Sequence, residues 1–112
     1  MPLIDLQSVK ELELTKGIRA RVVSTGNVSV AHVILDDGAV LPVHSHHNEQ
    51  IVDVIEGEME LTVEGIPYRL TAGHPFVLPP MTPHGARAIK RCYVIDIFHP
   101  VREDFVRATA HT

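Results

Sequence analysis

Four polar side chains of this 112-residue chain have the types and the spacing of ligands for one metal ion. His44 and His46 are two residues apart, so in an extended strand both imidazoles project from the same face. Gln50 has the same parity at the start of the next candidate strand, and His84 begins another strand just after Pro83. We therefore expect a metal site formed by His44, His46, Gln50 and His84.

The ligand near residue 50 is the open point in this set. Glu49 is chemically the better ligand, but its parity is opposite, so its side chain points away unless a bulge intervenes. With Gln50, three neutral imidazoles and a neutral amide leave the charge of the ion uncompensated, which favours a strong Lewis acid. These ligands favour Zn, Ni, Mn, Fe, Co or Cu over Ca or Mg without choosing among them. The expected cofactor is one divalent transition metal ion.

The other histidines carry weaker expectations. His47 is expected to be solvated or to support a neighbouring ligand. His32 shares its parity with Val30 and Ile34, which favours a hydrogen-bonded histidine in the core. No role is expected for the rest, which are His74, His99 and His111.

A second group suited to chemistry is Asp96, which lies in the middle of an apolar candidate strand. Its same-face neighbours are Val94 and Phe98, and burial in such surroundings is expected to raise the pKa of its carboxyl. One interpretation is an ion pair with Arg87 or Arg102. The other is a general base near the metal, able to move a proton near neutral pH.

Short alternating segments separated by turn residues must position these groups. Turn signals such as Asp36-Asp37-Gly38 and Pro79-Pro80-Met81-Thr82-Pro83 recur roughly every ten residues, which favours an antiparallel sandwich or barrel. A short helical turn is expected near residues 103–108. The expected strands are residues 19–24, 28–35, 50–55, 59–63, 66–70, 76–78, 85–89 and 92–98.

Two of these strands, residues 51–55 and 92–98, are largely apolar on both faces, unlike a strand with one face in solvent. Something is therefore expected to cover the outer face. The N-terminal segment can do so by folding back, and a second subunit is the alternative. Because so small a domain gains much by dimerising, we expect a homodimer.

Composition excludes several classes of function. Hydrophobic residues make up 45% of the chain and the net charge is only -4, which argues against nucleic acid or an anionic membrane as partner. No apolar run reaches the ~18 residues of a membrane span, and residues 1–10 lack the pattern of a signal peptide. A single cysteine, Cys92, fits a reducing cytoplasm. We expect one cytoplasmic domain over residues 1–112, with its core at 19–105, an N-terminal segment that adds edge strands and a frayed tail at 108–112.

The spacing around the first histidines resembles the first cupin motif. It consists of Gly38, five residues, His44 and His46, three residues, Gln50, six residues and Gly57. Glutamate is usual where this chain has Gln50.

A later segment resembles the second cupin motif. It consists of Gly73, five residues, Pro79 and then His84. Met81 stands where a glycine is usual, and Ala88 where an asparagine is usual. Over residues 19–105 the resemblance implies an all-β double-stranded β-helix, the jelly-roll barrel of the cupins, with the metal inside its mouth.

Residues 96–105 resemble the terminal stretch of KdgF-type cupins, which linearise the unsaturated uronates released from pectin and alginate. The resemblance implies that Asp96, Phe98 and Arg102 are catalytic. The metal and Arg102 would bind the substrate's carboxylate and neighbouring oxygens, Asp96 would move the proton, and Phe98 would wall the pocket. Alternatively, Arg102 only pairs with Asp96, Glu103 or Asp104 at the chain end.

Two other functions remain open at this point. Cupins with three histidine ligands also include dioxygenases, although the chain has no Trp and few other aromatic residues to stack on an aromatic substrate. A non-catalytic cupin that binds a sugar or metabolite is the other alternative.

Overall fold

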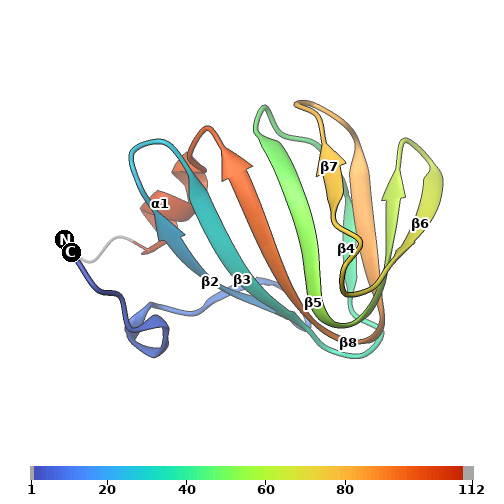
Figure 1. Ribbon diagram of the computed structural model, residues 1–112, viewed down its shortest axis with the longest axis horizontal. Coiled ribbons are helices and arrows are strands. Elements are labelled where there is room, and N and C mark those ends of the chain that lie inside the picture. Colours follow the sequence, from blue (N-terminus) through green and yellow to red (C-terminus); the bar gives the residue numbers. More distant parts are fainter. Residues whose placement is uncertain (1, 110–112) are drawn as a thin grey trace.

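Eight β-strands, a 3-10 helix and a short α-helix, with the loops that join them, make up residues 2–109, the part of the chain that this computed structural model describes. The strands form one antiparallel sheet that rolls into a jelly-roll barrel, as expected (Figure 1). The elements are a 3-10 helix η1 (Leu6–Ser8), β1 (Leu12–Thr15), β2 (Ile18–Ser24), β3 (Ser29–Leu35), β4 (Val40–His44), β5 (Glu49–Val63), β6 (Ile66–Leu70), β7 (Phe76–Leu78), β8 (His84–His99) and α1 (Glu103–Thr109).

Two long strands, β5 and β8, form the frame of the barrel and pair with each other from Glu49–His99 to Val63–His84. The sequence predicted each of them as two shorter strands, which is wrong. In β5 the residues around Gly57 form bulges, at which the register with β8 shifts, instead of a turn. Gly57 has a φ of 89°, and a Cβ there would overlap the backbone oxygen of Arg91, so only glycine allows the strands to pass so closely.

Strict alternation along the strands puts one face of each in the core. In β3 the buried residues are Ser29, Ala31, Val33 and Leu35. The expectation that His32 lies in the core is therefore wrong: it is half-buried on the outer face, where its Nδ1 lies 2.7 Å from the Tyr93 hydroxyl. The hydrogen bond was expected, but parity alone does not tell which of two apolar faces is the inner one.

One edge of the sheet contains a strand from the N-terminal segment, which was expected to add edge strands, while β4 is a strand that the pattern did not reveal. β1 pairs with β2 at one edge, so the N-terminal segment lengthens the sheet instead of lying over β5 and β8. Within the described residues, the side chains of Ile51, Val77 and Ile97 stay exposed on the outer face of the sheet. β4, which ends at His44, pairs with the first part of β8. The homodimer remains a prediction.

The chain ends in α1, which covers residues 103–109 where a helical turn was expected. Ala108 and Thr109 are helical instead of frayed, and residues 110–112, with His111, lie outside the described part. Among the described residues, no helix is long and apolar enough to cross a bilayer.

Candidate metal centre

Three histidines converge near one end of the barrel. His44 ends β4 and faces His84, the first residue of β8, across the pairing of these strands, while His46 follows β4 in the connection to β5. Their ring centroids lie 4.3 Å (His44–His84), 5.0 Å (His46–His84) and 5.7 Å (His44–His46) apart. One nitrogen of each ring lies within 4.8 Å of the others, close enough for a single ion to contact all three.

Backbone carbonyls fix which nitrogen of each ring carries the proton. A carbonyl oxygen can only accept a hydrogen bond, so each Nδ1 donates and each Nε2 keeps its lone pair, which is the form that binds a metal. The Nδ1 contacts are His44 to Pro42 O (2.9 Å), His46 to Asn48 O (3.0 Å) and His84 to Thr82 O (2.8 Å).

Burial keeps two of these imidazoles, those of His46 and His84, neutral. Desolvation lowers the pKa of His46, and it lowers the pKa of His84 to about 4, because a charged ring in this environment would lose its hydration. Neutral imidazole is the ligating form, so near neutral pH these rings need not release a proton before they bind a metal.

Gln50 brings a fourth donor to the same point. It is buried with 6% exposure, and its Oε1 lies 3.1 Å from His46 Nε2. Since His46 donates from Nδ1, its Nε2 carries a lone pair, and in this orientation of the amide a lone pair of Gln50 Oε1 faces it. Two donor atoms are arranged in this way when both bind one cation. Glu49 points outward instead: its side chain is 59% exposed and lies 3.8 Å from His99 Nδ1.

The donor set therefore fits a transition metal ion. Three nitrogens and one amide oxygen, all neutral, are the ligand types of Zn, Ni, Mn, Fe, Co and Cu, and these ligands do not discriminate among those ions. Because the protein supplies four ligands, an ion that accepts five or six would keep one or two coordination positions for a substrate in the open barrel.

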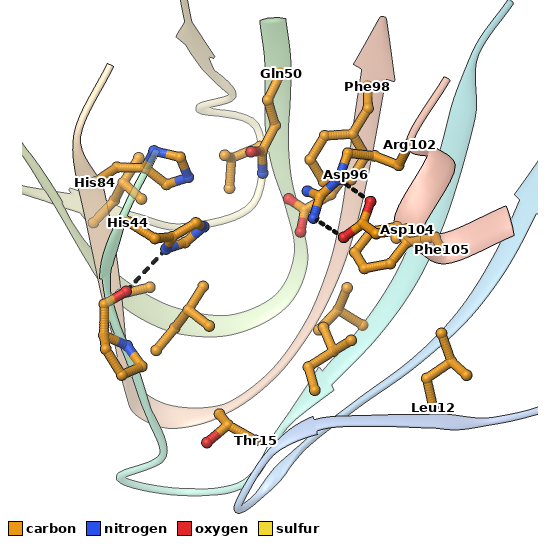
Figure 2. A pocket seen from close by; sticks show the side chains of 18 of the residues that line it. Leu12, Thr15, His44, Gln50, His84, Asp96, Phe98, Arg102, Asp104 and Phe105 are labelled. Carbon is orange, nitrogen blue, oxygen red and sulfur yellow. Dashed lines mark hydrogen bonds and ion pairs between the residues drawn. The ribbon is translucent and has the colours of Figure 1, made fainter. Parts of the chain in front are cut away.

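A cavity of about 650 Å³ adjoins this centre. His44, Gln50, His84, Asp96, Phe98 and Arg102 all line it (Figure 2). His46 is not on the cavity wall and packs edge-on against Phe98, with ring centroids 5.6 Å apart. Much of the remaining lining is apolar, with Val33, Val52 and Leu61 among it.

Asp96 faces the cavity without a charged partner. It lies opposite Val52 on the inner face of β8, and its Oδ1 is buried with no hydrogen-bond partner among the described residues. Desolvation raises the pKa of Asp96 to about 7, while the Gln50 amide and the Arg102 charge oppose the rise. The expected ion pair of Asp96 with Arg87 or Arg102 is wrong, because these arginines pair with Glu60 and Asp104.

Arg102 projects into the cavity from the segment between β8 and α1. Its guanidinium lies over two rings, with Cζ 4.8 Å from the Phe98 centroid and 4.1 Å from that of Phe105. Asp104 is its ion-pair partner, at 2.7 Å. Of the chain-end partners considered for Arg102, the structure thus selects Asp104.

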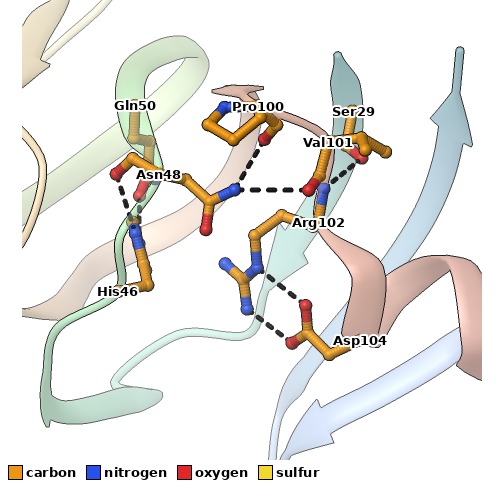
Figure 3. Close-up of polar contacts among 8 residues, drawn as sticks. All are labelled: Ser29, His46, Asn48, Gln50, Pro100, Val101, Arg102 and Asp104. Atoms are coloured by element: carbon orange, nitrogen blue, oxygen red, sulfur yellow. Dashed lines mark hydrogen bonds and ion pairs between the residues drawn. The ribbon is translucent and has the colours of Figure 1, made fainter. Parts of the chain in front are cut away.

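Sequence reasoning missed Asn48, which joins the histidine segment to the chain end. Its side chain is 2% exposed, and its Nδ2 donates to Pro100 O at 2.6 Å, while its own carbonyl accepts from His46 (Figure 3). An asparagine between two charged or polar neighbours is typical of a loop, so nothing in the local pattern indicated burial.

Comparison with known proteins gives consistent results. Residues 31–98 match the family Cupin_2, the cupin domain. The structure of KdgF from Halomonas sp. superimposes with a TM-score of 0.85 at 33% identity, covering 94% of this chain and 98% of that one. An RmlC-like cupin from Shewanella frigidimarina NCIMB 400 gives a TM-score of 0.82 at 32% identity, covering 88% and 90%.

A curated relative, H2HPP isomerase of Bacillus subtilis, is 35% identical over 74 residues. The match covers 64% of this chain but 31% of that protein, so the chain spans only about a third of its length. Together with the barrel and the three-histidine cluster, the match over residues 31–98 shows that this chain belongs to the cupin family.

Proposed function

We propose that this cupin is a metal-dependent isomerase that opens the ring of 4,5-unsaturated uronates and converts the resulting enol to a ketone. The observation that carries the proposal is the Asp96 carboxyl, whose Oδ1 is buried without a hydrogen-bond partner among the described residues and which lines one cavity with His44, His84 and Arg102. The similarity to KdgF over most of both chains supports this substrate class.

The reaction needs proton transfer and charge stabilisation but no redox change. The anomeric hydroxyl loses a proton and the ring oxygen gains one as the bond between C1 and the ring oxygen breaks, which leaves an aldehyde at C1 and an enol at C5. The enol then loses its hydroxyl proton while C4 gains one, so the product is an isomer of the substrate. A single group that both accepts and returns a proton satisfies this balance.

We assign these tasks to residues of the chain. Asp96 takes and returns the proton, since a carboxyl with a pKa of about 7 exists in both protonation states near neutral pH. Arg102 binds the substrate carboxylate, and Phe98 walls the cavity and limits water. His44, His46, Gln50 and His84 would hold the ion. When bound, the ion supplies Lewis-acid stabilisation of charge that develops on oxygen.

The proposal is tested by adding 4,5-unsaturated galacturonate and the monomers released from alginate to the metal-loaded protein. The expected result is loss of the ultraviolet absorbance of the conjugated enol without uptake of oxygen. Oxygen uptake would instead support a dioxygenase. Absence of turnover with every metal of the set would remove the isomerase and leave a sugar-binding cupin.

A second candidate is an isomerase of a bulkier carboxylate. The cavity of about 650 Å³ falls in the range of pockets that hold drug-sized ligands, and much of its inner wall is apolar. The similarity to an isomerase from Bacillus subtilis agrees with this class. In either case the proposed partner is a small carboxylated molecule, and a cytoplasmic homodimer remains the expected state.

A further inference from the structure

Two aromatic rings confine the guanidinium of Arg102 before any substrate arrives. Its side chain is only 14% exposed, and its Cζ lies over the rings of Phe98 and Phe105, 4.8 Å and 4.1 Å from their centroids. The two rings lie edge to face, 5.7 Å apart. Both rings attract the cation through their faces, so the sides of Arg102 that they occupy are closed to an incoming anion.

The backbone of Arg102 is held as well. Its N–H donates to Ser29 Oγ at 2.9 Å, and Ser29 is fully buried in β3. Asn48 binds the carbonyl oxygens of Pro100 and Val101 just before it (Figure 3). The side chain therefore starts from a fixed point, and its remaining freedom lies in its own torsions.

Asp104 removes that freedom by occupying one edge of the fork. Arg102 donates from Nε to Asp104 Oδ1 at 2.9 Å and from Nη2 to Oδ2 at 2.7 Å. A guanidinium has five N–H donors, and this contact uses the edge formed by Nε and Nη2. Among residues 2–109 no further side chain bonds to the edge formed by Nη1 and Nη2, so this edge offers two parallel donors to another carboxylate.

We propose that Asp104 is a positioning residue: it fixes the Nε–Nη2 edge of Arg102 so that the Nη1–Nη2 edge is presented to the carboxylate of the substrate. The inference rests on the proposed function for the identity of that substrate. Asp104 itself is 53% exposed and lies in the first turn of α1, so it can be changed without opening the core. It acts through Arg102 and does not touch the reacting atoms.

The test compares Asp104→Asn with Glu103→Gln in the metal-loaded protein. Both changes remove one negative charge from the first turn of α1, but only Asp104 bonds to Arg102. Asp104→Asn is expected to raise KM for unsaturated galacturonate about tenfold and to change kcat by less than about threefold, because lost preorganisation weakens binding. Glu103→Gln should leave both constants as in the wild type.

Two further measurements separate positioning from general damage. In an Arg102→Lys background the fork is absent, so Asp104→Asn should change KM by less than about twofold. Titration with saturated galacturonate, which lacks the reacting double bond, should show the same weakening of Kd, since binding needs no turnover.

The outcomes distinguish this inference from the proposed function. If uronates are not turned over but Asp104→Asn still weakens galacturonate binding, the proposed function fails and the positioning role stands. The positioning role is overturned if KM and Kd of Asp104→Asn equal those of the wild type. It is also overturned if Glu103→Gln has the same effect, or if kcat falls while KM stays constant.

Discussion

Asp96→Asn is expected to lower turnover of unsaturated uronates by about 10²- to 10⁴-fold, the usual contribution of a general acid–base group. The amide has nearly the shape of the carboxyl but cannot accept the proton, so fold and metal content should be unchanged. Asp53→Asn is the matched control, because Asp53 lies on the same strand pair but does not line the cavity. Steady-state kinetics together with metal analysis of both variants measure the effect.

The same substitution should stabilise the metal-free protein at high pH. The folded state holds the pKa of Asp96 at about 7 against an ordinary 3.8, so between these values it binds more protons than the unfolded chain. Stability of the wild type therefore falls as the pH rises through this range. The gain of Asp96→Asn should be absent near pH 4 and level off above pH 7 at no more than about 4 kcal/mol.

Chemical denaturation at several pH values in the presence of a chelator measures this difference. A pH-independent difference between variant and wild type would show that Asp96 has no raised pKa in the fold. Unchanged turnover in Asp96→Asn, with the metal bound, would remove the general-base role.

His84→Ala is expected to lose the metal and, with it, the activity. His84 is 3% exposed and lies within reach of both other rings, so removing it leaves an incomplete set. Because the loss of groups that only support a ligand already costs 10- to 100-fold in affinity, we expect a loss of at least about 100-fold. His47→Ala is the control, since His47 is exposed and stands outside the cluster.

Thermal unfolding reports the same loss independently of activity. At a free ion concentration of about 100 times its Kd, binding stabilises a folded protein by about 2.7 kcal/mol. Added metal should therefore raise the Tm of the wild type and of His47→Ala. It should leave the Tm of His84→Ala unchanged. A similar rise in all three proteins would place the ion elsewhere.

The alternation of side chains along a strand explains why so much of the centre was predictable. Side chains alternate with a period of two residues, so His44 lies on the same side as its neighbours in the cluster. The same alternation points Gln50 inward and Glu49 outward, and it places Asp96 on the face of Phe98. These relations are local and do not depend on contacts with distant parts of the chain. The motif spacings supplied the remaining step, which is that distant strands meet.

Long-range contacts explain what was missed. Whether Gly57 marks a turn or a bulge depends on the approach of residue Arg91, which the sequence around Gly57 does not contain. The partner of Arg102 is set by the direction of the segment between β8 and α1. The positive φ of 64° at Met81, where a glycine is usual in the motif, is likewise a property of the folded loop, whose Met81 N–H donates to His46 O.

One ion shared by three imidazoles and an amide is the centre of the proposed mechanism, and a crystal structure of the metal-loaded protein tests this most directly. Diffraction data collected on both sides of the absorption edge of Zn or Ni locate the ion without reference to the side chains. We predict one anomalous peak per chain, about 2.0–2.3 Å from Nε2 of His44, His46 and His84, with Gln50 Oε1 in the same coordination shell. A peak at His47, Glu49 or His99, or a cluster that stays empty at stoichiometric metal, would contradict the account.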